Sequence, residues 1–404
     1  MVHRPAGLTA QDAQKDYLPR VQQVFGATLI LRLNQSVCGL IDESSVLSST
    51  VELINPLITD EIVMENAIVP LEADFTTPLA YMLEHAPATK GITGLLRAEA
   101  WKERQGLFML QPYQKDRIPV VFVHGLMSTP RTWLPLFNDL LNDKELRKKY
   151  QFWFFMYPTG NPIVFSANSL RESILEIRRK YDPHGDDLSF NQMVMIGHSM
   201  GGIITRMMVI NPGNKLWDTI SDIPLDQMGL EDQDRDLVER TILFKAIPCV
   251  KRAVFICAPF RGSDYARKTI GKIGSSLIKL PFTVLSPLQR VIPEFQNTEN
   301  KEVQEFLKGK LTSVKGLSPK NPALQTLIKV PIKSDVVYHS IMGNKKEADV
   351  PGGTDGIVTY DRAYLEGAAS EKIVHSEHNA HTKAATIAEI RRILHLHLET
   401  IKEE

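Results

Sequence analysis

The sequence predicts an α/β protein with a mostly parallel central sheet and helices on both faces. From Ile118 onward, short apolar runs alternate with turns and with longer segments of helical periodicity. Runs that are apolar throughout, rather than at every second residue, are typical of parallel strands buried on both faces. Six runs are therefore expected to be strands: "IPVVFVHG", "QFWFFMYP", "QMVMIGHS", "KRAVFICAP", "DVVYHSIMG" and "SEKIVHS".

The N-terminal region differs from this pattern. Between residues 24 and 69 the chain contains β-branched runs, such as "ATLILRLN" and "SSTVELI", which are broken by Ser, Asn and Pro. These features predict an irregular, β-rich appendage over residues 1–70 and a main domain over residues 71–404. At the start of the main domain, "LEADFTTPLAYMLEH" and "GITGLLRAEAWKER" have the spacing of helices.

Two intervals are too long to be simple connections between strands. Residues 211–250 contain the acidic stretch "LEDQDRDLVER", whose charges are expected on a solvated face. Residues 261–334 contain "IGKIGSSLIKLPFTVLSPLQRVIPEF", with apolar residues at helical spacing. Because long structureless loops are uncommon in compact domains, we predict insertions at both places and a cap from the second. Periodicity alone equally allows this second segment to be packed core.

Composition excludes several classes of protein. The 404 residues carry 47 Lys and Arg against 47 Asp and Glu, which argues against a nucleic-acid partner. No apolar stretch approaches the roughly 18 residues that a membrane-spanning helix needs. The cysteines, Cys38, Cys249 and Cys257, form neither a metal-type pair nor an even disulfide framework, so we expect core residues and no metal. The first 20 residues lack the apolar segment of a secretory signal, which predicts a cytoplasmic protein unless a signal precedes this chain.

The stretch "GHSMGG" carries the strongest chemical signal. Gly197, His198, Ser199, Met200 and Gly201 lie between an apolar run and a helical segment, so this G-x-S-x-G motif occupies a strand-to-helix turn. Such a turn, the nucleophile elbow, holds a serine hydroxyl exposed above the sheet. The glycines are expected because a side chain at either position would collide with the neighbouring strand or helix. The helix N-terminus also brings free N–H groups to the place where negative charge would develop.

Further motifs accompany the elbow in a definite order. They are "HGLMSTPRTW", "FWFFMYPTGNPIVFSANSLR", "GHSMGG", "FICAPFRGSDYA", "TDGIVTYDRAYLEGAASEKIV" and "SEHNAH". From about residue 119 to its C-terminus, the chain resembles the α/β-hydrolase superfamily and, more narrowly, bacterial serine esterases and lipases. The resemblance implies the α/β-hydrolase fold with an inserted cap or lid. It also implies hydrolysis of a carboxylic ester through a Ser-His-Asp triad and an acyl-enzyme, without a cofactor.

An oxyanion hole is also implied by this resemblance. In the family, a His-Gly pair at the end of an early strand opens the loop that completes the hole, and His124 and Gly125 stand at that place. The expected donors are the backbone N–H groups of Leu126 and of Met200, the residue after the nucleophile. We expect His124 to support the loop and Gly125 to let the backbone approach the substrate.

The triad is expected in the family's order of Ser, then Asp or Glu, then His. Asp355 follows a strand within a Gly-rich loop and is the expected acid, with Asp361 in "TYDRAY" as the second candidate. Three histidines, spaced three apart, follow the last predicted strand. His375 is too close to that strand to reach back over the elbow, and His381 lies near the next helix. His378 is therefore the expected base, with His381 as the alternative.

Together these expectations describe a serine carboxylic-ester hydrolase whose partner is a small-molecule or lipid ester. The apolar residues of the predicted cap favour short to medium acyl chains, because each buried methylene adds up to about 0.8 kcal/mol until the pocket is full. An acyltransferase, a thioesterase or a peptidase would use the same triad, and these alternatives stay open. A non-catalytic binding protein of this fold is disfavoured, because all three triad positions are occupied.

Overall fold

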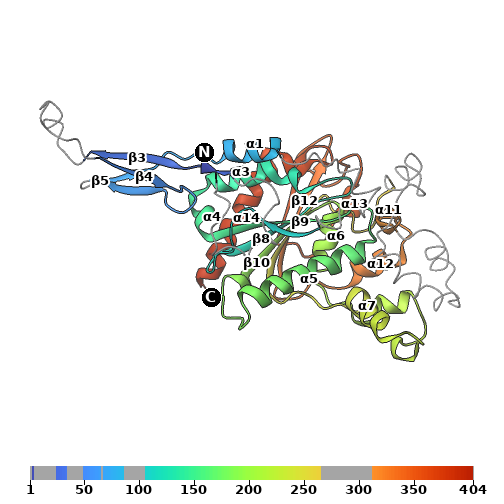
Figure 1. Ribbon diagram of the computed structural model, residues 1–404. Helices are drawn as coiled ribbons and strands as arrows, with labels where there is room; N and C mark the ends of the chain where they lie inside the picture. Colours follow the sequence, from blue (N-terminus) through green and yellow to red (C-terminus); the bar gives the residue numbers. More distant parts are fainter. Residues whose placement is uncertain are drawn as a thin grey trace, which may run out of the picture.

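Seven strands form one sheet in the order β13-β12-β11-β10-β8-β9-β7, with helices on both faces (Figure 1). The computed structural model describes residues 2–3, 24–33, 49–64, 67–85, 105–264 and 312–403. Every pair of neighbouring strands is parallel except β7 and β9, so the predicted fold class, a mostly parallel sheet of the α/β-hydrolase type, is confirmed. The strands are β7 (Gly106–Met109), β8 (Ile118–Val123), β9 (Tyr150–Met156), β10 (Met193–His198), β11 (Val250–Ile256), β12 (Val337–Asn344) and β13 (Ser370–His375).

One strand of this sheet, β7, is absent from the sequence interpretation. It pairs antiparallel with β9, with Leu107 opposite Phe155 and Met109 opposite Trp153. Its four residues are too few to establish a periodicity, which explains why the pattern did not reveal it. The helix predicted over residues 91–104 lies outside the described residues.

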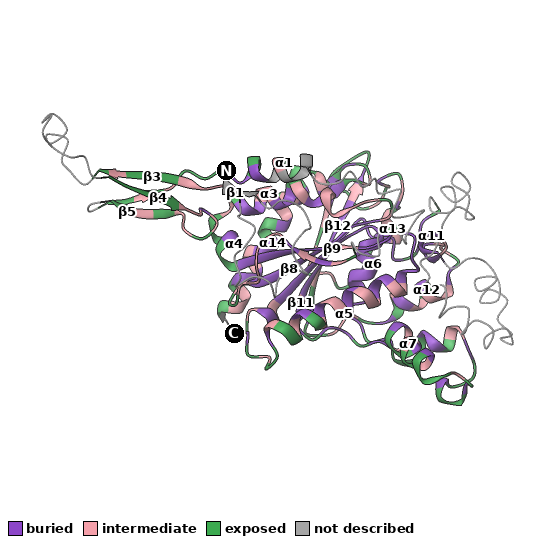
Figure 2. Cartoon of the chain, in the orientation of Figure 1, coloured by how far each residue is buried: buried purple, intermediate pink, exposed green. Residues whose placement is uncertain are grey.

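Alternate side chains of the central strands enter two different cores. In β8, Val121 and Val123 pack with α5 (Ile163–Tyr181) and α6 (Met200–Arg206), whereas Val120 and Phe122 pack on the opposite face. Both faces therefore need apolar side chains, and Figure 2 shows the central strands buried along their length. α12 (Pro322–Lys329) contributes to the first core. The second core contains side chains of α3 (Leu134–Asn142), α4 (Lys144–Lys149) and α14 (Ala384–Glu403).

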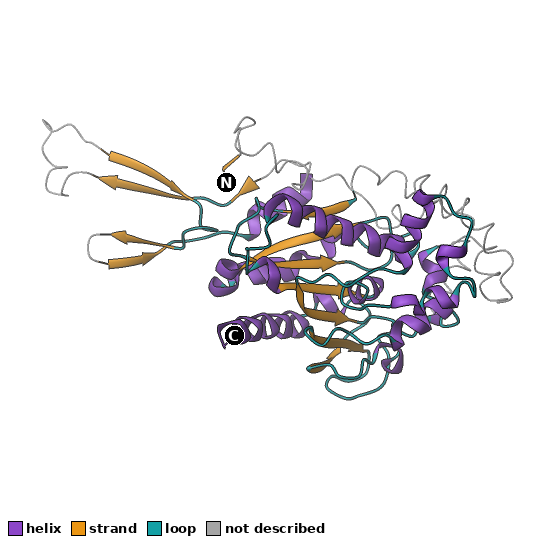
Figure 3. Ribbon diagram, turned by 90° about the horizontal axis from the view of Figure 1, so that it is seen from below, coloured by secondary structure: helices purple, strands orange, loops and turns teal. Residues whose placement is uncertain are grey.

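The N-terminal strands pair with one another and not with the main sheet. β3 (Thr28–Leu33) pairs with β4 (Ser49–Ile54), β5 (Glu61–Met64) with β6 (Ala67–Pro70), and the short β1 (Val2–His3) with β2 (Val24–Phe25). The first two of these hairpins project away from the body of the molecule (Figures 1 and 3). At their base, Asp60 forms an ion pair of 3.0 Å with Lys148 of α4. α1 (Thr76–His85) follows these hairpins, and the Thr76 hydroxyl donates to Asn138 of α3 at 3.0 Å.

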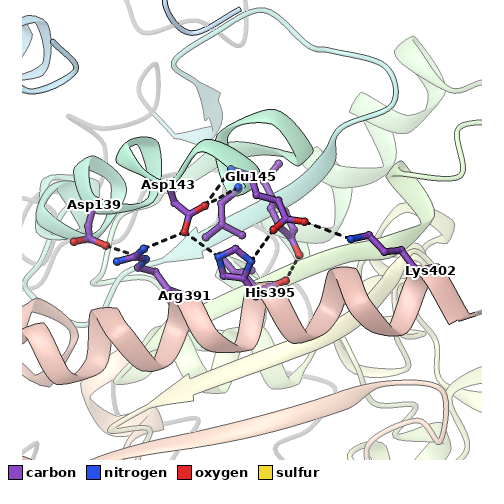
Figure 4. A network of polar contacts seen from close by, with 9 residues as sticks. Asp139, Asp143, Glu145, Arg391, His395 and Lys402 are labelled. Carbon is purple, nitrogen blue, oxygen red and sulfur yellow. Dashed lines mark hydrogen bonds and ion pairs between the residues drawn. The ribbon is translucent and has the colours of Figure 1, made fainter. Parts of the chain in front are cut away.

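The last helix, α14, is attached to α3 and α4 by charged side chains (Figure 4). Asp143 Oδ2 lies 2.9 Å from His395 Nε2 and accepts a hydrogen bond of 3.1 Å from Arg391. The same carboxylate accepts the N–H groups of Glu145 and Leu146 and therefore caps α4. Burial raises the pKa of Asp143, but the bonds from His395, Leu146 and Arg391 outweigh burial, so the pKa is lowered from its usual value. One side chain thus connects the α3–α4 junction to α14.

Both predicted insertions contain short helices where the structure describes them. Residues 211–250 contain α7 (Asp232–Ile242) and pack around a small core of Trp217, Leu225, Met228 and Val238. In the predicted cap over residues 261–334, residues 265–311 lie outside the described residues. The described remainder includes α11 (Ser313–Gly316) and α12. Among the residues that the structure describes, no helix is both long enough and apolar enough to cross a membrane.

Candidate active site

The candidate site lies at the point where the order of strands reverses. β9 follows β8 in sequence and lies on one side of it, whereas β10 lies on the other side. In open α/β sheets, ligands bind at the carboxyl ends of the strands beside such a reversal. Ser199 directly follows β10 and His124 directly follows β8, so both residues lie at this edge of the sheet.

Ser199 has the backbone geometry of a sharp strand-to-helix turn. Its φ of 54° and ψ of −125° are rare for a residue other than glycine and cost about 1–3 kcal/mol. The Ser199 N–H donates to the carbonyl of Ile256 in β11 at 2.8 Å, and the Ser199 carbonyl accepts the N–H of Gly202 at 2.9 Å. These two bonds hold the strained residue between a neighbouring strand and the first turn of α6.

The glycines of the elbow are required by the close approach of backbone atoms. A Cβ at Gly197 would lie 2.5 Å from the carbonyl oxygen of Gly201, and a Cβ at Gly201 would lie 2.5 Å from that of His124. Backbone oxygens cannot rotate out of the way, so neither position accepts a side chain without a shift of β8 or α6. A Cβ at Gly125 would lie 2.9 Å from the Cβ of Ser199, which shows how closely the loop after β8 passes the serine.

The structure brings Ser199, His378 and Asp355 together through hydrogen bonds. His378 Nε2 lies 2.8 Å from Ser199 Oγ, and His378 Nδ1 lies 2.7 Å from Asp355 Oδ2. The other carboxylate oxygen accepts the N–H groups of Ile357 and Val358. Burial raises the pKa of Asp355, but the bonds from His378 and from these N–H groups outweigh burial, so the pKa is lowered. A charged Asp355 accepts a hydrogen bond from the Nδ1–H group of His378, which leaves the lone pair of Nε2 facing the serine hydroxyl.

The competing candidates have other contacts. Asp361 is exposed on α13 (Tyr360–Ala363). His375 ends β13, and its Nε2 lies 3.0 Å from the carbonyl oxygen of Lys345. His381 is buried, and its Nε2 contacts the hydroxyl of Thr132. The assignment of Asp355 and His378 as triad members stays a prediction, and these contacts agree with it.

The expected oxyanion donors belong to the two segments that meet at Ser199. Met200 is the first residue of α6, so its N–H has no acceptor within the helix. Leu126 belongs to the loop after β8, where the Tyr157 hydroxyl donates to the His124 carbonyl at 2.6 Å. The rings of His124 and Tyr157 stack with centroids 4.5 Å apart, and burial lowers the pKa of His124 to about 4. A neutral, stacked His124 is suited to the supporting role predicted for it, which stays a prediction.

Cys257 lies beside the candidate triad, a position that the sequence interpretation missed. Its Sγ, a carboxylate oxygen of Asp355 and a ring nitrogen of His378 lie within 4.8 Å of one another. Burial raises the pKa of the Cys257 thiol well above its usual value, whereas a metal would be bound by a thiolate. The set therefore fits a thiol beside a charged carboxylate better than it fits a cation site. The position of Cys257 in the sequence could have indicated this contact, because Cys257 directly follows β11, the strand next to β10.

Comparisons with known proteins agree with this architecture over part of the chain. Residues 114–223 match the family described as "PGAP1-like alpha/beta domain", and this range contains β8, β9, β10 and Ser199. No match was found among curated proteins.

Similar solved structures include three bacterial proteins. The Bacillus licheniformis lipase BlEst2 in propeptide form is 16% identical, with a TM-score of 0.38; the match covers 70% of this chain and 51% of that one. The Staphylococcus hyicus lipase is 12% identical, with a TM-score of 0.42 and coverage of 72% and 99%. The lin2722 product of Listeria innocua is 17% identical, with a TM-score of 0.36 and coverage of 68% and 92%. The chain thus spans about half the length of the first structure.

Proposed function

We propose that this chain is a serine carboxylic-ester hydrolase. The observation that carries the proposal is the pair of hydrogen bonds at His378, one of 2.8 Å to Ser199 Oγ and one of 2.7 Å to Asp355. A nucleophile within reach of a base, and a base oriented by a third group, is the arrangement that activates a serine for acyl transfer. The strained backbone of Ser199 supports the same interpretation, because strain of this kind is concentrated at functional sites.

In the proposed reaction, Ser199 Oγ attacks the ester carbonyl while His378 Nε2 takes the hydroxyl proton. The tetrahedral oxyanion accepts hydrogen bonds from the N–H groups of Leu126 and Met200. His378 then returns the proton to the leaving alcohol, and the acyl group stays on Ser199. A water molecule that His378 deprotonates attacks this acyl-enzyme, and His378 returns the proton to Ser199 Oγ as the bond to the acyl group breaks and the carboxylic acid is released. Asp355 stabilises the imidazolium that forms in each half of the reaction.

The proposed substrate is a small-molecule or lipid ester with a short to medium acyl chain. A panel of p-nitrophenyl esters of graded acyl length tests both the activity and this preference. Hydrolysis is expected to be fastest for the shorter half of the panel. If the main product in the presence of an added alcohol is a new ester, the chain is an acyltransferase with the same triad.

The central test is Ser199→Ala in the full chain. Because the serine hydroxyl is the proposed nucleophile, kcat should fall by roughly 10⁴-fold or more while the cooperative unfolding transition is preserved. An organophosphonate that labels active serines should modify the wild type and not the variant. His375→Ala is the matched control, since its ring contacts only a loop carbonyl among the described contacts. Turnover of Ser199→Ala near the wild-type rate would refute the proposal.

A further inference from the structure

Behind the triad, two buried imidazoles from different segments lie against each other. His198 is the last residue of β10, directly before Ser199, and His381 belongs to the turn η11 (Ala380–Thr382). Their ring centroids are 3.9 Å apart, and the two residues are only 6% and 4% exposed. In the contacts of the described residues, neither ring is hydrogen-bonded to Ser199 Oγ, which lies 2.8 Å from His378 Nε2.

The His198 ring is bonded to the backbone of the proposed base. Its Nε2 lies 2.7 Å from the carbonyl oxygen of His378. A carbonyl oxygen only accepts hydrogen bonds, so Nε2 carries the proton and donates it, which also sets the tautomer of His198. This bond joins the residue before the nucleophile directly to the residue that would take the nucleophile's proton.

His381 extends the connection to the oxyanion side of the site. Its Nε2 contacts the hydroxyl of Thr132, which lies in the turn η4 (Pro130–Trp133) that follows the loop of His124 and Gly125. The indole of Trp133 packs edge-on against His381, with centroids 5.2 Å apart, and against His198 at 6.4 Å. The elbow, the His378 loop and the segment after the oxyanion loop therefore meet at one pair of rings.

The two rings are suited to this place because they stay uncharged. Burial lowers the pKa of His198 well below its usual value and lowers the pKa of His381 to about 3. The centroid of His198 lies 4.9 Å from that of His378, which would become an imidazolium during the reaction. A second positive charge at that distance would oppose this charge, whereas a neutral ring does not.

We propose that His198 and His381 are a positioning pair that holds the His378 loop in register with the elbow and with the oxyanion side. His198 fixes the backbone of His378, so that Nε2 stays within hydrogen-bonding distance of Ser199 Oγ. His381 connects this arrangement to Thr132. This inference rests on the proposed function, because it assigns His378 as the base.

The test compares substitutions that keep ring volume with substitutions that keep the donor. His198→Phe fills the same space but removes the Nε2 proton, whereas His198→Gln retains an N–H donor at the end of the side chain. Because a displacement of about 1 Å costs on the order of 10²-fold in rate, we expect His198→Phe to lower kcat by roughly 10- to 100-fold with KM within about twofold. His198→Gln should recover kcat to within a few fold of the wild type.

His397→Phe is a closely matched control. His397 is 3% exposed, and its Nε2 lies 2.8 Å from the carbonyl oxygen of Gln192, which is the same kind of ring-to-backbone bond. It belongs to α14 and is bonded to none of the three proposed triad residues in the contacts of the described chain. Its loss should lower the midpoint of thermal unfolding and leave kcat unchanged.

Several outcomes would overturn the positioning role. Equal losses of kcat in His198→Phe and His397→Phe would show a general effect on stability, and a folded His198→Gln as slow as His198→Phe would exclude the donor. If His198→Phe does not fold, Thr132→Val provides the second measurement, with an expected loss of about 3- to 10-fold in kcat and no loss if the inference is wrong. Activity in Ser199→Ala would instead refute the proposed function itself.

Discussion

The close packing of α6 against the segment after β11 predicts that one substitution destabilises the fold and that a second substitution suppresses this effect. A Cβ at Gly202 would lie 2.5 Å from the Cβ of Ala258, about 1 Å inside the normal contact of two carbon atoms. Overpacking of this kind costs about 1–3 kcal/mol, while alanine in place of glycine within a helix returns about 1 kcal/mol. Gly202→Ala should therefore lower the free energy of unfolding by up to about 2 kcal/mol. Denaturant unfolding, followed by the fluorescence of the buried tryptophans, measures this loss.

Ala258→Gly removes the obstructing methyl group. The next atom of residue 258, its Cα, would lie 3.5 Å from the new Cβ, which is an ordinary contact. The double variant should therefore be at least as stable as Ala258→Gly alone, with a favourable coupling energy of about 1–3 kcal/mol. Gly201→Ala is the contrasting case, because its Cβ would meet backbone oxygens that no side-chain change can move. A coupling energy near zero between positions 202 and 258 would refute this account of the packing.

Three further predictions concern the proposed acid of the triad, the buried histidines and the attachment of α14. Asp355→Asn should reduce kcat by roughly 10⁴-fold, and Asp361→Asn should leave it near the wild-type value; the reverse order in ester hydrolysis would transfer the role. His124, His339 and His397 each have a pKa lowered by burial to about 4, so the unfolded chain binds more protons than the folded chain between about pH 4 and 6.5. The contribution of these neutral histidines to the free energy of unfolding is therefore fully present above pH 6.5. It decreases as the pH is lowered, by about 2 kcal/mol per histidine at pH 5. Between pH 7 and pH 5, the free energy of unfolding of His397→Phe, measured with denaturant, should fall by about 2 kcal/mol less than that of the wild type. An equal fall in the two proteins would contradict this prediction. Asp143→Ala should destabilise the fold more than Asp143→Asn, by about 1 kcal/mol, because Asn keeps the cap of α4 and loses only the charge; equal thermal midpoints would contradict it.

The sheet could be predicted because buried parallel strands leave a local pattern in the sequence, whereas the expected order of the triad residues came from the resemblance to the α/β-hydrolase superfamily. The run from Met193 to His198 is mostly apolar because both faces of β10 are buried, and an apolar run of this kind can be recognised from the sequence alone. Asp355 could be selected because a Gly-rich turn after a strand places a carboxylate at the sheet edge. The contacts of Thr132 with His381 and of Cys257 with Asp355 could not be predicted in this way, since they join residues far apart in sequence. Only the packing of the finished sheet brings them together.

The same backbone conformation occurs directly after two neighbouring strands. Ser199 and Cys257 directly follow β10 and β11, and both have positive φ values, 54° and 48°. The N–H of each donates at 2.8 Å to a carbonyl oxygen of the next strand, from Ser199 to Ile256 and from Cys257 to Ile341. The proposed nucleophile and the neighbour of the proposed triad acid are thus turned out of the sheet by equivalent bonds of the parallel ladder. A change in the register of β11 would therefore displace both residues together, which ties the geometry of the site to the pairing of the strands and not to the loops alone.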